Sequence, residues 1–346
     1  ICPGYKKNFS ILRLIDHFIL ALNLKKILNL QSKLPDVAFI GYPPIETSYV
    51  LMKWLKKNDI PYLLDIKDQW PQVFVDAFPK FLRFFAYLCF FPYFILSKKI
   101  IRQSNGISTI SKSFLEWALT FSTRNKNKFD IISPLTSPKQ KLKVIDETVA
   151  LNWWSKRGIV KNGLFKVIFI GSFSKAFDFN VIFETATKLF NKKVNCEFIL
   201  CGDGELSSHL KNKSKYYNNM KIIDWIDSKK IAALVKISSA FIAPYKNKPD
   251  FVKSIPNKVI DALKFGLPLV SPLKGEVQSL IKNYKIGVSY NDAQSLGVSL
   301  KKLINNKTIC KKYSYNSIKL YQSKFEFENV YGQLVLHLES LKKSER

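Results

Sequence analysis

The sequence predicts an α/β protein built from two doubly wound domains. With 346 residues, the chain is long enough for two domains of ordinary size. Short apolar runs that end in Gly or Asp recur along the chain, and each is typical of a buried parallel strand. Stretches with helical spacing of apolar residues separate these runs. Alternation of strand and helix predicts a doubly wound parallel sheet.

The individual strands are expected where the apolar runs fall. In the second half they are residues 167–171, 198–202, 221–224, 240–243 and 268–270, with helices at 229–235 and 259–264. In the first half they are residues 37–40, 62–66 and 107–110, with helices at 49–57 and 82–102. Terminal helices are expected within residues 305–339.

The domain boundary is expected within residues 133–161, which begin as a polar, turn-rich stretch and carry no strong strand. We therefore expect an N-terminal domain over 1–155 and a C-terminal domain over 156–322. A terminal helix within 323–346 is expected to pack back on the first domain. Because ligands of open α/β sheets bind outside the carboxyl ends of the strands, functional residues should lie in the loops that follow them.

Charge is the unusual feature of the composition. The chain has 55 Lys and Arg against 26 Asp and Glu, a formal net charge of +29. A field of that sign attracts polyanions, and nucleic acid and anionic lipid headgroups are the two candidates. Codon bias can raise the Lys content but does not explain the shortage of carboxylates. Since no recognition helix or RNA-binding motif is present, we expect an anionic membrane surface and no nucleic acid.

Aromatic residues concentrate in residues 81–96, FLRFFAYLCFFPYFIL, and Lys98, Lys99 and Arg102 follow them. The segment is too short and too interrupted to span a bilayer, and its composition suits the headgroup boundary. A buried helix of the first domain is the alternative. Cys89, inside this apolar run, is expected to be a buried small side chain.

The most informative segment is residues 254–270, SIPNKVIDALKFGLPLV. Pro256 near the start and Gly266 just past the end predict a helix. The N-terminus of a helix offers unpaired N–H groups and a positive dipole end, which suit a diphosphate. Lys258 adds a point charge in the first turn, and Asp261 could accept hydrogen bonds from ribose hydroxyls. The alternative is an ordinary amphipathic helix with a proline start and a glycine stop.

The segment resembles the P-x-K-x-x-E-x-x-x-x-G-x-P-V motif of family 4 retaining glycosyltransferases. The resemblance implies the GT-B fold, in which two Rossmann-like doubly wound domains face each other across a cleft. In that family the Glu binds the ribose of the nucleotide, and Asp261 stands at its position. Lys253 occupies the place, eight positions earlier, where the family usually has a Glu near the sugar ring. Asn257, inside the motif, belongs to the same expected nucleotide-sugar site.

Two further segments of the second half resemble the same family. In FIGSFSKAFD, residues 169–178, Gly171 allows close backbone approach and Lys175 would face the diphosphate, while Ser172 stands where many relatives have Arg. In CGDGE, residues 201–205, Gly202 and Gly204 would open space beside the nucleotide. Trp225 falls where the family contacts the base. The alternatives are ordinary turns, a solvated Lys and a core Trp.

In the first half, DIKDQWP at residues 65–71 resembles a D-x-R-D-x-W-P element of a bacterial branch that builds surface polysaccharides. Residues 4–8, 15–17, 35–36 and 42–46 fit the same branch. Many relatives place a His-Asp pair on the acceptor side after this strand, and here the pair is Lys67-Asp68. We expect Lys67, Asp68 and Lys175 to act in catalysis. The family's N-terminal strand and glycine-rich loop are missing from the sequence, so the first domain is expected to lack them.

These segments together imply transfer of a sugar from a nucleoside diphosphate donor to a lipid-linked or saccharide acceptor, with retention of anomeric configuration. Lys175, Lys258 and helix N–H groups would stabilise the departing diphosphate. No Asp-x-Asp motif or zinc spacing is present, so we expect no metal and no cofactor besides the donor substrate. We expect the protein in the cytoplasm, peripheral on the inner face of the membrane. The alternatives are a GT-B sugar-nucleotide epimerase and an inactive membrane-bound partner subunit.

Overall fold

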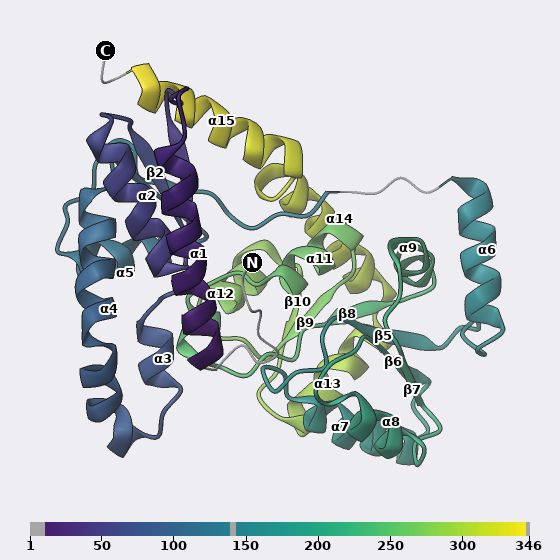
Figure 1. Cartoon of the computed structure of the whole chain (residues 1–346). Coiled ribbons are helices and arrows are strands. Elements are labelled where there is room, and N and C mark those ends of the chain that lie inside the picture. Colours follow the sequence, from purple (N-terminus) through teal and green to yellow (C-terminus); the bar gives the residue numbers. More distant parts are fainter. Residues whose placement is uncertain (1–10, 139–142, 344–346) are drawn as a thin grey trace. The chain divides into compact units, whose positions relative to one another are not determined.

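The computed structural model describes residues 11–138 and 143–343 (Figure 1). The chain divides into two compact units. The first unit comprises Ile1–Pro134 and Val330–Arg346, and the second comprises Leu135–Asn329. Each unit contains one sheet in which every neighbouring pair of strands is parallel, so the predicted α/β architecture is confirmed.

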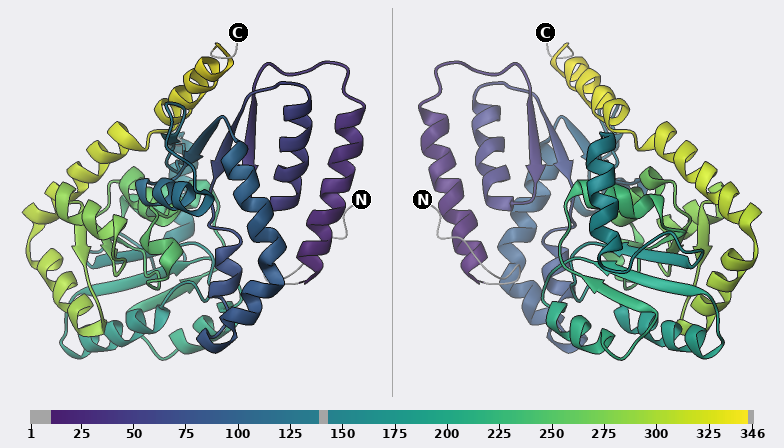
Figure 2. Two further views of the ribbon diagram at one scale, coloured as in Figure 1. Left: turned by 90° about the vertical axis from the view of Figure 1, so that its left-hand side faces the viewer. Right: turned by 90° about the vertical axis from the view of Figure 1, so that its right-hand side faces the viewer.

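The first unit has a four-stranded sheet in the order β1-β2-β3-β4. Its strands are β1 (Ala38–Tyr42), β2 (Tyr62–Ile66), β3 (Gly106–Thr109) and β4 (Ile131–Ile132). Its helices are α1 (Ile11–Asn29), α2 (Ile45–Lys57), α3 (Gln72–Asp76), the 3-10 turn η1 (Lys80–Leu82), α4 (Arg83–Gln103), α5 (Lys112–Ser122) and α15 (Phe327–Lys343). Figure 2 shows α2 lying between α1 and α4.

Side chains of β2 alternate between the two faces of this sheet, as a strand requires. Tyr62, Leu64 and Ile66 point to one face, where they pack with buried residues of α2, α4 and α5 in one core. Leu63 points to the other face, where Leu334 and Leu341 of α15 cover it. The last helix therefore completes the core of the first unit.

The second unit has a six-stranded sheet in the order β10-β9-β8-β5-β6-β7. Its strands are β5 (Phe165–Ile170), β6 (Cys196–Cys201), β7 (Met220–Ile223), β8 (Ala240–Ile242), β9 (Leu269–Ser271) and β10 (Gly287–Ser289). Its helices are α6 (Val144–Ser155), α7 (Phe179–Asn191), α8 (Ser207–Ser214), α9 (Ser228–Lys236), α10 (Pro249–Val252), α11 (Asn257–Phe265), α12 (Glu276–Tyr284), α13 (Ala293–Asn305) and α14 (Lys307–Lys324). This order is that of a Rossmann fold, with the switch point between β5 and β8.

Helix α6 belongs to the second unit, whereas the sequence places it in the first domain. Its Trp154 is fully buried in the second core, and the indole N–H donates to the Lys230 carbonyl at 2.9 Å. A buried Trp needs both an apolar pocket and an acceptor for its N–H, and α9 supplies the acceptor. The chain therefore passes from one unit to the other before this helix begins.

Candidate active site

The candidate site is built on the carboxyl edge of the second sheet, at its switch point. β5 and β8 are neighbours, and the chain leaves them in opposite directions toward β6 and β9. Residues 171–178 follow β5, and residues 243–256 follow β8 and lead into α11. A doubly wound sheet binds its ligand in the crevice between two such loops.

Two glycines let the backbone segments of this edge touch. The Gly171 N–H donates to the Cys201 carbonyl at 2.9 Å, which continues the β5–β6 pairing past the strand end. A methyl group on Gly202 would lie 1.8 Å from the Gly171 carbonyl oxygen. No side chain fits there, so this contact requires glycine.

Helix α11 presents its first turn to the same place. It begins at Asn257 after Pro256, and Gly266 ends it in the left-handed conformation, as the sequence predicts. Lys258 crosses Gly171 so closely that a methyl group there would lie 2.3 Å from Lys258 Cε and 3.1 Å from Nζ. The ammonium of Lys258 is thereby held at the end of β5.

Asp261 lies one turn further along α11, between two cations. Its carboxylate is 3.5 Å from Lys258 Nζ and 3.4 Å from Lys264 Nζ. Lys264 also donates to the Ser137 hydroxyl at 2.8 Å. Tyr245, from the loop after β8, lies beneath this turn, and burial raises its pKa, so the phenol stays protonated. Asp261 thus remains partly exposed and oriented by lysines on both sides.

Lys175 is oriented by a carboxylate that the sequence analysis did not single out. Its ammonium lies 3.5 Å from Glu205, and its backbone N–H donates to Glu205 Oε1 at 2.9 Å. That backbone hydrogen bond and the nearby ammonium hold the pKa of Glu205 below its usual range. Glu205 is the last residue of the CGDGE segment. Its position next to the predicted Gly204 is the feature of the sequence from which it could have been selected as a site residue.

The remaining predicted residues of this unit lie in the surrounding loops. Gly204 packs against the loop after β5, where a methyl group would come within 2.8 Å of the Phe173 carbonyl oxygen. Trp225 is 74% exposed just after β7, so the core-Trp alternative is wrong. Lys253 is half-buried at the end of α10. Ser172, in the loop after β5, and Asn257, the first residue of α11, are also exposed.

A second group of polar residues lies at the carboxyl end of β2 in the first unit. Asp65 is buried, accepts a hydrogen bond from the Ser108 hydroxyl at 2.8 Å, and lies 3.1 Å from Lys67 Nζ. Burial raises the pKa of Asp65, and Lys67 and Ser108 oppose that shift. Asp68 is exposed in the loop that follows. The predicted Lys67 is therefore ion-paired with Asp65. Asp65 is the first residue of the DIKDQWP segment, but the sequence analysis did not select it as a site residue.

Within residues 11–138 and 143–343, no group of three or more His, Cys, Asp or Glu side chains is arranged to hold a metal ion. At the carboxyl edges of both sheets, the charged side chains are lysines paired with single carboxylates. Such an arrangement suits an anionic ligand that is recognised by cations, backbone N–H groups and one carboxylate for hydroxyl groups.

Residues 154–320 match the family model described as "Glycosyl transferases group 1". The match lies within the second unit and includes Gly171, Gly202 and α11. No curated protein matches the chain in sequence.

Solved structures show the fold of the whole chain. Sucrose-phosphate synthase from Thermosynechococcus elongatus is similar at a TM-score of 0.69 and 13% identity, over 97% of this chain and 82% of that one. Anabaena HepE, in complex with UDP, is similar at a TM-score of 0.69 and 12% identity, over 93% of this chain and 82% of that one. WaaG, a glycosyltransferase involved in lipopolysaccharide biosynthesis, is similar at a TM-score of 0.60 and 10% identity, over 95% of this chain and 96% of that one. The chain has the GT-B fold, with two Rossmann-like domains, as predicted.

Proposed function

We propose that this protein is a retaining family 4 glycosyltransferase. It moves a sugar from a nucleoside diphosphate donor to a lipid-linked or saccharide acceptor during synthesis of a surface polysaccharide, such as lipopolysaccharide or capsule. The observation that carries the proposal is the position of Lys258 across Gly171, at the switch point of a group 1 domain. Support for a nucleotide-sugar donor comes from Anabaena HepE, whose solved structures include complexes with UDP and with UDP-glucose.

The donor's diphosphate would lie at the first turn of α11. There the ammonium of Lys258 and the positive end of the helix dipole stabilise negative charge as the sugar–phosphate bond breaks. Asp261 accepts hydrogen bonds from the ribose hydroxyls, and its two lysine neighbours orient its carboxylate. Lys175, positioned by Glu205, adds a second cation from the loop after β5. These groups supply positioning and charge, without a metal.

In the first unit, the Asp65–Lys67 pair and Asp68 form the acceptor side. The Lys67 side chain is 37% exposed, while Asp65 is buried, so the lysine is the part of the pair that an incoming ligand can reach. An ammonium at this place attracts the phosphate of a lipid-linked acceptor. Asp68, exposed beside it, is the group that can take a proton from an acceptor hydroxyl.

Calorimetric titration with UDP tests the donor site. Lys258→Ala and Asp261→Ala should each weaken UDP binding by roughly 10- to 150-fold, the loss expected from a charge-assisted hydrogen bond of about 1.5–3 kcal/mol. Lys302→Ala, an exposed lysine of α13, serves as the matched control and should bind like the wild type. Affinity in EDTA should equal affinity with Mg²⁺. Unchanged affinity in both site variants would remove α11 from the donor site and end the proposal.

A further inference from the structure

One exposed stripe runs the length of η1 and α4. Exposed side chains recur along it every three or four residues, which places them on one side of the helix. Phe81, Phe84 and Phe85 at its beginning are 77%, 67% and 62% exposed. The apolar part continues through Leu88, Phe91 and Ile95, and the stripe then ends in Lys98, Lys99 and Arg102. We call this surface the α4 stripe: it is aromatic at one end and cationic at the other.

The opposite side of α4 is anchored in the first unit. Ile100 and Ile101 are fully buried in the main core, and Phe94 is buried in a smaller cluster. Phe90 stacks on Phe74 with ring centres 5.1 Å apart, so it is not part of the exposed surface. Cys89 is exposed on the helix, which corrects the expectation that it is buried.

The helix Lys80–Gln103 is long and apolar enough to cross a membrane by length and composition, and Pro92 does not interrupt it. The sequence had suggested a segment too interrupted for that. Its buried side, however, is part of a protein core, so lipid cannot surround the helix while the unit keeps this structure. A helix with one protein face and one aromatic face fits the plane of the headgroup boundary.

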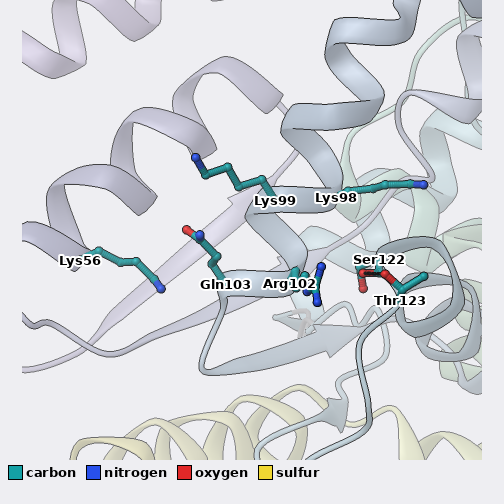
Figure 3. Close-up of a pocket in the computed structure, with 7 residues that line it drawn as sticks. All are labelled: Lys56, Lys98, Lys99, Arg102, Gln103, Ser122 and Thr123. Atoms are coloured by element: carbon teal, nitrogen blue, oxygen red, sulfur yellow. Dashed lines mark hydrogen bonds between the residues drawn. The ribbon is translucent and has the colours of Figure 1, made fainter.

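The cationic end of the stripe borders a pocket of about 630 Å³ (Figure 3). Three elements line it: α2 with Lys56, α4, and the end of α5 with Ser122 and Thr123. From α4 come Lys98, Lys99, Arg102 and Gln103. Lys98 and Lys99 lie at the two edges of the stripe and point away from each other, so the positive charge is spread across the opening.

No carboxylate lines this pocket. Its four cations take part in no ion pair with the described residues of the chain. Lys98 lies 5.7 Å from the centre of the Phe121 ring and Lys99 lies 6.0 Å from that of Tyr49; these rings carry no net charge, so neither contact neutralises the ammonium. Positive charge without an internal counter-charge calls for anions from outside the protein.

We propose that the α4 stripe is the membrane-binding surface of this protein. The phenylalanines insert at the headgroup boundary of an anionic membrane, and the pocket beside Lys98, Lys99 and Arg102 takes the phosphates of anionic phospholipids. The aliphatic part of the stripe favours a lipid surface over a nucleic acid, because exposed side chains such as Leu88 and Ile95 neither stack on bases nor pair with phosphates. The inference concerns a surface apart from the donor site and is tested without any sugar nucleotide.

Vesicle co-sedimentation tests it. The wild type should bind phosphatidylcholine vesicles that contain phosphatidylglycerol, and binding should weaken with salt. Lys98→Gln/Lys99→Gln/Arg102→Gln should lose about 100-fold in low-salt binding, since each cation near an anionic surface contributes about five-fold. Lys302→Gln/Lys311→Gln/Lys312→Gln removes the same charge from exposed sites on α13 and α14 and should lose far less. Equal losses in the two triple variants would overturn the proposal, as would a wild type that stays in the supernatant at low salt.

The aromatic end needs its own measurement. Phe84→Ser/Phe85→Ser should reduce the binding that remains at high salt, with a thermal melt like that of the wild type because both rings are exposed. As a second measurement, a fluorophore is attached to Cys89 in a Cys2→Ser/Cys310→Ser background; Cys196 and Cys201 are buried and will not label. The emission of this fluorophore should shift to the blue when anionic vesicles are added. Co-sedimentation without any shift would show that another face binds the membrane and would refute the assignment.

Discussion

Replacing Gly171 by alanine tests whether Lys258 has to lie across the end of β5 for the donor to bind. The new methyl group would meet Lys258 Cε at 2.3 Å, so the flexible lysine must swing away. If its ammonium contacts the diphosphate, Gly171→Ala should weaken UDP binding about as much as Lys258→Ala, roughly 10- to 150-fold. The double variant should then lose no more than either single one, because both changes remove the same contact.

Backbone strain has to be separated from this effect. Gly171 has φ +156°, and alanine in such a region costs about 1–3 kcal/mol of stability. Gly163→Ala is the matched control, because Gly163 has φ +79° and nothing within 4 Å of the added methyl group. It should lower the melting temperature and leave UDP affinity unchanged. If Gly171→Ala binds UDP like the wild type, or if the double variant loses the sum of the two single losses, Lys258 does not act through this geometry.

Two predictions concern stability. Asp130→Ala should lower the unfolding free energy of the first unit, measured in urea, by roughly 3–5 kcal/mol. It leaves the buried Arg124 without the carboxylate that its guanidinium contacts at 2.8 and 3.0 Å. Glu116→Ala, which breaks the exposed ion pair with Lys112, should leave the urea midpoint unchanged. For Asp65, the folded-state pKa lies above the ordinary value, so the ionised form destabilises the fold and the penalty disappears as pH falls through the folded pKa. The unfolding free energy of Asp65→Asn relative to the wild type should therefore increase from a pH near the ordinary Asp value of 3.8 to about pH 8, and a constant difference would contradict the sign of that shift.

Most strands of the fold were predictable from apolar runs, because a strand buried on both faces needs an uninterrupted run. β5, for example, spans Phe165–Ile170 where residues 167–171 were expected. Two strands were missed for the same physical reason. β4 has only two residues, Ile131–Ile132, and β10, Gly287–Ser289, contains one large apolar residue, so neither forms an apolar run. Both are edge strands whose position depends on a neighbour already in place.

The proposed donor site was predictable from the sequence to the extent that its residues are close together in the chain. Proline and glycine bound α11, and spacing alone put Lys258 and Asp261 on its first turns. What the sequence could not give is pairing between distant segments. Glu205 orients Lys175 across 30 residues of chain, and Ser108 lies 43 residues from the Asp65 that it hydrogen-bonds. Such contacts depend on which loops the sheet order brings together.

The lysines of this strongly basic chain fall into two kinds, and the difference separates its two proposed ligands. Lys258, Lys175 and Lys67, at the strand ends, each lie within 3.5 Å of a carboxylate. A carboxylate partner lowers the attraction of a lysine for any loose anion and fixes its direction, so a ligand must match the geometry as well as the charge. The cations at the end of α4 have no such partner among the described residues and therefore attract any dense anionic surface. In the two proposals, lysines paired with a carboxylate recognise a nucleotide selectively, whereas unpaired cations attach the protein to a membrane where they are clustered beside exposed aromatic side chains.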